Sequence, residues 1–189
     1  MPSDTLKESD DDQWLGSLFQ FPTVLHARAA LSFDMTQESL QRSLLSALSS
    51  LSRSFISKEI SIADREGYAK GNVNFKIGIG NGDGLDILDG KEEERVLNRI
   101  ENRGAFNILD LGFHLQYKIN DGLRHRVHED HYLIRLAFDR GRVEMLVHHL
   151  KGIRRVDPVE LVSIVLDQLN SRLRRQQLPE LSLQVVNSD

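Results

Sequence analysis

Cysteine is absent from the 189-residue chain. A chain without thiols has no disulfide framework, no thiolate zinc site and no thiol nucleophile. Any ligand or catalytic chemistry must therefore come from imidazole, carboxylate, amide or hydroxyl groups. Hydrophobic residues make up 40% of the chain and charged residues 28%, as in ordinary globular proteins. The composition predicts a packed core and excludes the disordered and collagen-like classes.

Long hydrophobic runs are also absent, and no stretch approaches the length that spans a bilayer. Residues 1–13 are acidic and polar, whereas a secretory signal needs a basic start followed by an apolar run. The sequence therefore predicts a soluble, cytoplasmic protein that makes no membrane contact.

Positive charge is not in excess either. The formal net charge of -4 arises in residues 1–12, which hold five acidic residues and one lysine. We expect residues 1–12 to form an acidic flexible tail and residues 13–189 to form a single α+β domain. A neutral domain lacks the strongly basic balance of a general nucleic-acid binder, although local arginine patches can still contact phosphates.

Three segments combine apolar residues at helical spacing with a start signal. They predict helices over 35–53, 91–103 and 158–174, the first with a stripe of leucines at 40, 44, 48 and 51. In each segment an aspartate stands three residues before a glutamine or glutamate: Asp34 before Gln37, Asp89 before Glu92, and Asp157 before Glu160. A shorter helix is predicted over 14–19, since Trp14, Leu15, Leu18 and Phe19 follow helical spacing ahead of Pro22.

Strands are indicated by strict alternation, which is clearest over residues 108–119. The turn signals Asn120-Asp121-Gly122 and Asp139-Arg140-Gly141 predict two hairpins. Further strands are predicted over 23–33, 55–63, 72–79 and 181–185. The fold class predicted is α+β, with a mainly antiparallel sheet of about six to eight strands and about three capped helices packed against it.

The Gly/Asp-rich segment 78–90 fits none of the phosphate or calcium motifs. A P-loop would need a glycine where Leu85 stands, a dinucleotide fingerprint would need one at Asp83, and an EF-hand would need an oxygen ligand at Ile79. A looser calcium site of Asp83, Asp86 and Asp89 stays open beside a plain connector. The sequence thus identifies no cofactor.

The histidines suggest a metal site, which depends on the register of the second hairpin. A three-residue turn at 139–141 opposes His131 to His149, with Glu129 or Asp130 as a third ligand and His128 nearby. A two-residue turn opposes His131 to Leu150 instead. The candidate metal ligands are His131, His149, Asp130 and His128, and surface histidines on a polar strand face are the alternative.

Arginines form the second candidate surface. The residues proposed to contact a partner are Arg124 and Arg126 near one turn and Arg154 and Arg155 before the last predicted helix. Solvated arginines that shield a sheet edge are the simpler interpretation of the same residues.

Function rests on these features. The leading hypothesis is a non-enzymatic binding or assembly module that offers a sheet edge, or the Arg/His-rich surface, to a protein partner or to a second copy of the chain. The alternatives are a metal-dependent hydrolase or nuclease that uses the His/Asp cluster, and a nucleic-acid-binding protein that acts through the arginine patches.

Overall fold

The computed structural model describes residues 13–61, 68–119 and 128–188 of the chain. Within them it contains eight strands and three α-helices. In chain order these are β1 (Ala27–Ser32), α1 (Gln37–Ser52), β2 (Phe55–Ser61), β3 (Tyr68–Asn81), β4 (Gly84–Ile87), α2 (Gly90–Arg103), β5 (Ile108–Ile119), β6 (His128–Asp139), β7 (Arg142–Gly152), α3 (Pro158–Arg175) and β8 (Ser182–Ser188).

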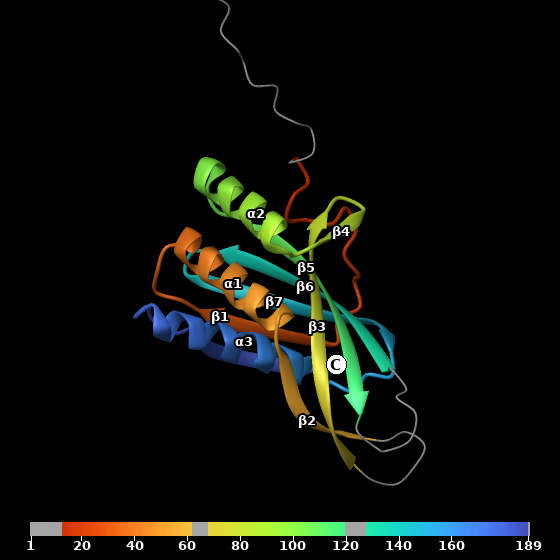
Figure 1. The fold of residues 1–189 in the computed structure, drawn as a ribbon. Helices are drawn as coiled ribbons and strands as arrows, with labels where there is room; N and C mark the ends of the chain where they lie inside the picture. Colours follow the sequence, from red (N-terminus) through yellow and green to blue (C-terminus); the bar gives the residue numbers. More distant parts are fainter. Residues whose placement is uncertain (1–12, 62–67, 120–127, 189) are drawn as a thin grey trace, which may run out of the picture.

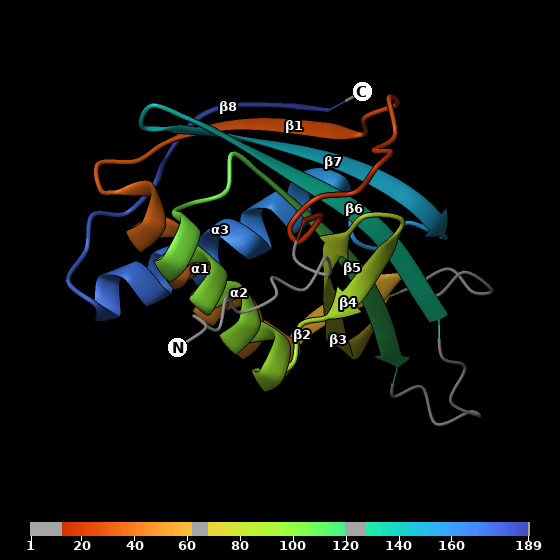
Figure 2. The ribbon, with the colours of Figure 1, turned by 90° about the horizontal axis from the view of Figure 1, so that it is seen from above.

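The strands form one sheet in the order β2-β3-β5-β6-β7-β1-β8, and β4 pairs with β3 beside this path. Every pair is antiparallel. The sheet is curled like half of a barrel, and α1 and α3 lie within its curve (Figures 1 and 2). The predicted α+β class with an antiparallel sheet and three helices is confirmed.

Two of the three predicted helix starts are confirmed. Asp89 accepts the backbone N–H groups of residues 91 and 92 at the start of α2, and Asp157 accepts the N–H of Val159 at the start of α3. For α1 the prediction was wrong, because the N-cap is Thr36, whose hydroxyl accepts the Ser39 N–H. The threonine lies next to the first helical residue, whereas Asp34 is too far back to reach those amides.

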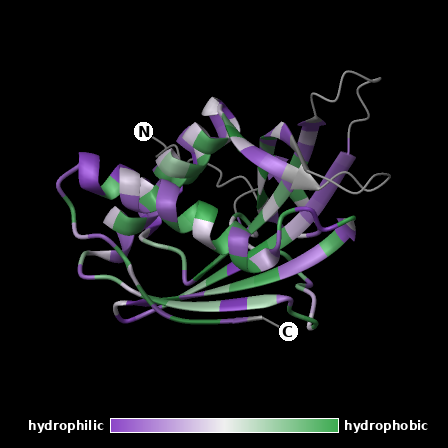
Figure 3. Ribbon diagram, turned by 90° about the horizontal axis from the view of Figure 1, so that it is seen from below, coloured by the Kyte–Doolittle hydropathy of each residue, from purple (hydrophilic) through white to green (hydrophobic). Residues whose placement is uncertain are grey.

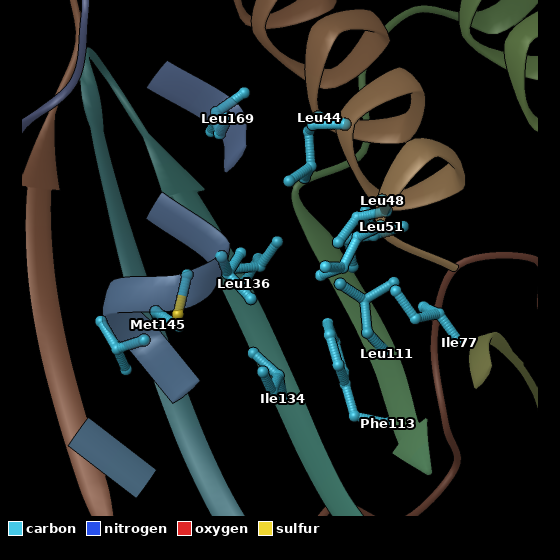
Figure 4. Packing of buried hydrophobic residues seen from close by; sticks show 14 of the residues in the cluster. Leu44, Leu48, Leu51, Ile77, Leu111, Phe113, Ile134, Leu136, Met145 and Leu169 are labelled. Carbon is cyan, nitrogen blue, oxygen red and sulfur yellow. The ribbon is translucent and has the colours of Figure 1, made fainter. Parts of the chain in front are cut away.

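The core fills the space between the inner face of the sheet and the helices. Leu44, Leu48 and Leu51 of α1 point toward Leu111 and Phe113 of β5, and all five are buried (Figure 4). Hydrophobic and hydrophilic residues alternate along the strands because successive side chains face opposite sides of a sheet (Figure 3). Each strand in the middle of the sheet therefore has one inner, apolar face and one outer face.

The segment before β1 is not the predicted helix. Leu15 and Leu18 instead form isolated bridges with Asn81 and Gly82, respectively, at the tip of the β3–β4 hairpin. From there the chain runs along the outside of the sheet to the start of β1 (Figure 2). We call residues 13–26 the strap. Its helical spacing of apolar residues was overridden by backbone hydrogen bonds to the sheet, such as Gly16 N–H to the Gly80 carbonyl (2.7 Å).

The strap covers a buried ion pair on the outer face. Arg135 donates two hydrogen bonds to Asp110, at 2.7 and 2.8 Å, and the Asp110 side chain is fully buried. The strap completes the pair, because the Leu18 N–H donates to the same carboxylate and the Phe21 ring lies 4.5 Å from the Arg135 guanidinium. A buried charge needs such partners to be tolerated.

Among the described residues, no helix has both the length and the apolar character needed to cross a membrane.

Candidate metal centre

The turn between β6 and β7 decides where the predicted metal ligands lie. It is a two-residue turn of Arg140 and Gly141, both with positive φ, and Asp139 pairs with Arg142. His149 therefore pairs with Tyr132, and a bulge then places His131 opposite Lys151. The predicted pairing of His131 with His149 is wrong, because the three-residue turn on which it depended does not form.

Asp130 and His149 do come together, on the inner side of the sheet. The Asp130 carboxylate is fully buried and lies 3.2 Å from His149 Nε2. It accepts hydrogen bonds from the Tyr117 hydroxyl (2.6 Å) and from the backbone N–H groups of Arg154 (2.7 Å) and Arg155 (2.8 Å). Both oxygens are thus occupied by protein donors, which is the arrangement of a structural carboxylate.

Burial raises the pKa of the Tyr117 hydroxyl, and the hydrogen bond to Asp130 adds to this effect. Tyr117 therefore stays protonated and acts as a donor to Asp130. His128, the fourth candidate, is the first residue of β6 and pairs in register with Tyr117 of β5. Because side chains alternate along β6, His128 faces the same side of the sheet as Asp130, opposite to the side that His131 faces. The four predicted ligands are consequently divided between two faces.

On the outer face His131 has other neighbours. It lies directly opposite His114 of β5, and the two rings stack with centroids 4.2 Å apart and an angle of 12° between them. Glu129 stands two residues before His131 on the same face. Its Oε2 lies 3.1 Å from His114 Nε2 and 3.7 Å from His131 Nε2. We call these three residues the outer cluster.

The outer cluster stands out among the described residues. It is the one group of three His, Asp or Glu side chains there whose ligand atoms all lie within 4.8 Å of one another. His114 Nε2 is buried and, although close to Glu129, has no aligned hydrogen bond. The looser calcium site of Asp83, Asp86 and Asp89 does not form such a group, since Asp86 binds Asn81 and Arg95 and Asp89 caps α2.

The electrostatics of the outer cluster favour metal ligation. Burial of the ring, and next the charges of His114 and Lys151, lower the pKa of His131 below its ordinary value. A hydrogen bond from Gln116, followed by the neighbouring imidazoles, lowers the pKa of Glu129. At neutral pH the site thus offers a neutral imidazole and an ionised carboxylate, which are the forms that bind metal.

A shallow groove of about 200 Å³ adjoins the outer cluster on the outer face. Its walls are apolar and include Leu85, Ile87, Leu133 and Leu150, and its floor reaches His114 and His131. Ile87 and Leu150 are 71% and 53% exposed, so the walls of the groove present apolar surface to solvent. A Cβ at Gly112 in the floor would lie 2.3 Å from Leu85 Cδ1, so a larger residue there would displace the Leu85 side chain.

The arginines predicted to contact a partner have two different outcomes. Arg124 and Arg126 lie outside the described residues. Arg154 and Arg155 follow β7, where their backbone amides bind Asp130. The Arg154 guanidinium lies 3.6 Å from Asp157. The chain at these two arginines is therefore fixed by a buried carboxylate.

His114 was missed as a ligand by the sequence analysis. The available signal was its place on the polar face of β5, in a hairpin with the His131 strand. A two-residue turn at Asp121-Gly122 would, however, have opposed His114 to Glu129. The observed register opposes it to His131, which the turn signal alone did not predict.

Comparison of the chain with protein-family models, curated proteins and solved structures finds no match. The geometry of the site is thus the basis for any functional conclusion.

Proposed function

We propose that this protein binds a divalent transition-metal ion through His114, Glu129 and His131. The observation that carries the proposal is the convergence of two imidazoles and one carboxylate, all within 4.8 Å, from two neighbouring strands of one sheet face. Two histidines and one glutamate are a donor set that suits zinc, and also iron or nickel, better than calcium or magnesium.

The site is supported by its rigid surroundings. The ligands lie on paired strands, so their backbone positions are set by the hydrogen bonds of the sheet. Gln116 donates to Glu129 Oε1 at 3.2 Å and leaves Oε2 directed at the two imidazoles. A partner that orients a ligand in this way strengthens metal binding.

The proposed role is binding and not hydrolysis. Three protein ligands leave a coordination position open for a water or an outside ligand. Zinc hydrolases of the HExxH type add a glutamate as general base, whereas the described residues that line the groove include no carboxylate. The groove therefore favours an apolar ligand held beside the metal. This agrees with the binding module preferred from the sequence.

Zinc titration of the full chain, by calorimetry after dialysis against a chelator, tests the proposal. One ion should bind per chain in the wild type. His131→Ala and Glu129→Gln should each weaken binding by more than the about 10- to 100-fold that the loss of an orienting partner costs, because they remove a direct ligand.

His148→Ala is the matched control. His148 lies on the next strand, β7, and its Nδ1–H donates to the Val24 carbonyl of the strap (2.7 Å), away from the proposed ligands on β5 and β6. The affinity of the His148→Ala variant for zinc should equal that of the wild type. Absence of stoichiometric binding, or equal losses in all three variants, would refute the assignment.

A further inference from the structure

The two edges of the sheet differ in how they are protected. The strand order ends at β2 on one side and at β8 on the other. On β2, Lys58 forms an ion pair with Glu160 of α3, and Glu59 is exposed. Charged side chains on an edge discourage the addition of another strand. β2 is thus a protected edge.

β8, by contrast, carries no charged side chain. Its sequence, Ser-Leu-Gln-Val-Val-Asn-Ser, contains neither a charge nor a proline. Leu183 and Val185 are 47% and 50% exposed, while Val186 packs partly against the core. On its inner flank β8 pairs antiparallel with β1 over six residue pairs, with a bulge at Gln184 between Leu183 and Val185. An uncharged edge strand with exposed apolar side chains is a template for a further strand.

We propose that β8 pairs with the β8 strand of a second copy of this chain, antiparallel about a twofold axis. A second copy fits this edge because the strand is compatible with itself. With no charge between residues 182 and 188, antiparallel self-pairing opposes no like charges in any register. A twofold contact is also closed, so it makes dimers and not fibres. The pairing would cover the exposed side chains and join two antiparallel sheets into one.

The proposal has a geometric consequence at Val185, the middle residue of the strand. If the twofold axis passes there, each Val185 lies opposite its copy, with Cα atoms about 4.5–5.5 Å apart. That separation falls within the range that a disulfide spans. Because the chain has no cysteine, a single cysteine introduced there can form a disulfide only between two chains.

The experiment measures the mass of the full-length chain in solution and its cross-linking. Sedimentation should give a dimer for the wild type. Val185→Lys places two like charges at the axis and should weaken the dimer at least about tenfold. Ser57→Lys, an exposed position on β2, is the control and should leave the dimer intact. Under mild oxidation Val185→Cys should form covalent dimers, whereas Ser57→Cys should not.

A wild type that is strictly monomeric overturns the proposal, and so does a dimer that survives Val185→Lys. Preferential cross-linking through Ser57→Cys also overturns it, since the contact would then be at β2. Loss of the dimer in Val185→Lys without cross-linking of Val185→Cys supports β8 as the contact and moves the axis away from Val185. None of these outcomes depends on metal, so the two proposals fail separately.

Discussion

Glu129 and Asp130 are consecutive carboxylates on β6, and the sheet separates them completely. Asp130, on the inner side, is fully buried and holds Tyr117, His149 and the backbone amides of Arg154 and Arg155. Glu129, on the outer side, has a single amide donor and lies beside two imidazoles. The same chemical group is thus structural where its acceptor sites are filled by protein donors. It is available to a ligand where they are not.

This comparison predicts its largest effect for Asp130→Ala. The substitution leaves two backbone N–H groups and the Tyr117 hydroxyl buried without an acceptor, which should lower the free energy of unfolding by about 3–5 kcal/mol. Urea denaturation measures the loss. Glu129→Gln, one residue away and half exposed, should change the free energy of unfolding by less than about 0.5 kcal/mol. Similar losses for both variants would contradict the division of roles.

A smaller effect is expected for Gly152→Ala, which disturbs Asp130 from the opposite strand. Gly152 has φ +113°, and a Cβ there would lie 2.2 Å from Asp130 Oδ1. Strain in the backbone and crowding of the carboxylate together should cost about 2–4 kcal/mol. Gly84→Ala is the control, because no atom lies within 4 Å of the Cβ position there. In thermal unfolding, the melting temperature of Gly152→Ala should therefore be clearly lower than that of Gly84→Ala. Equal melting temperatures would exclude the predicted crowding.

The smallest effect is the pH dependence of stability that arises from His131 on the outer face of the sheet. The pKa of His131 is lowered in the folded protein, so the unfolded chain binds more protons as the pH falls through the ordinary histidine value. The stabilising contribution of the neutral ring is complete above that value and is lost below it. Without metal, the melting temperature of the wild type should fall more between pH 7.5 and 5.5 than that of His131→Gln. Parallel curves for the two proteins would show that His131 is not linked to folding.

Helices and strands were predicted well because their signals are local. Asp89 and Asp157 cap α2 and α3 as the spacing indicated, and β5 has the bounds that its alternation predicted. The failure over residues 14–19 has a physical reason. Helical spacing of apolar residues does not reveal that the backbone groups of Gly16 and Ser17 will pair with a distant hairpin.

The candidate site was only half predictable, because it depends on register. His131 and Glu129 were identified as candidate ligands, but His114 requires the pairing of β5 with β6. Asp130 and His149 were grouped from their residue types, and they do meet. The residue types alone did not reveal that the Tyr117 hydroxyl and two backbone amides of the loop after β7 donate hydrogen bonds to the Asp130 carboxylate.

The bulge in β7 has a consequence for how this chain tolerates change. Leu150 is the extra residue. Before it His149 pairs with Tyr132, and after it Lys151, instead of Leu150, pairs with His131. The segment that follows reaches Asp130 because of that shift. The constraint here is on length more than on identity. Many side chains are compatible with position 150. Deleting the residue, however, would shift the backbone amides of Arg154 and Arg155 by one position, away from the buried Asp130 carboxylate.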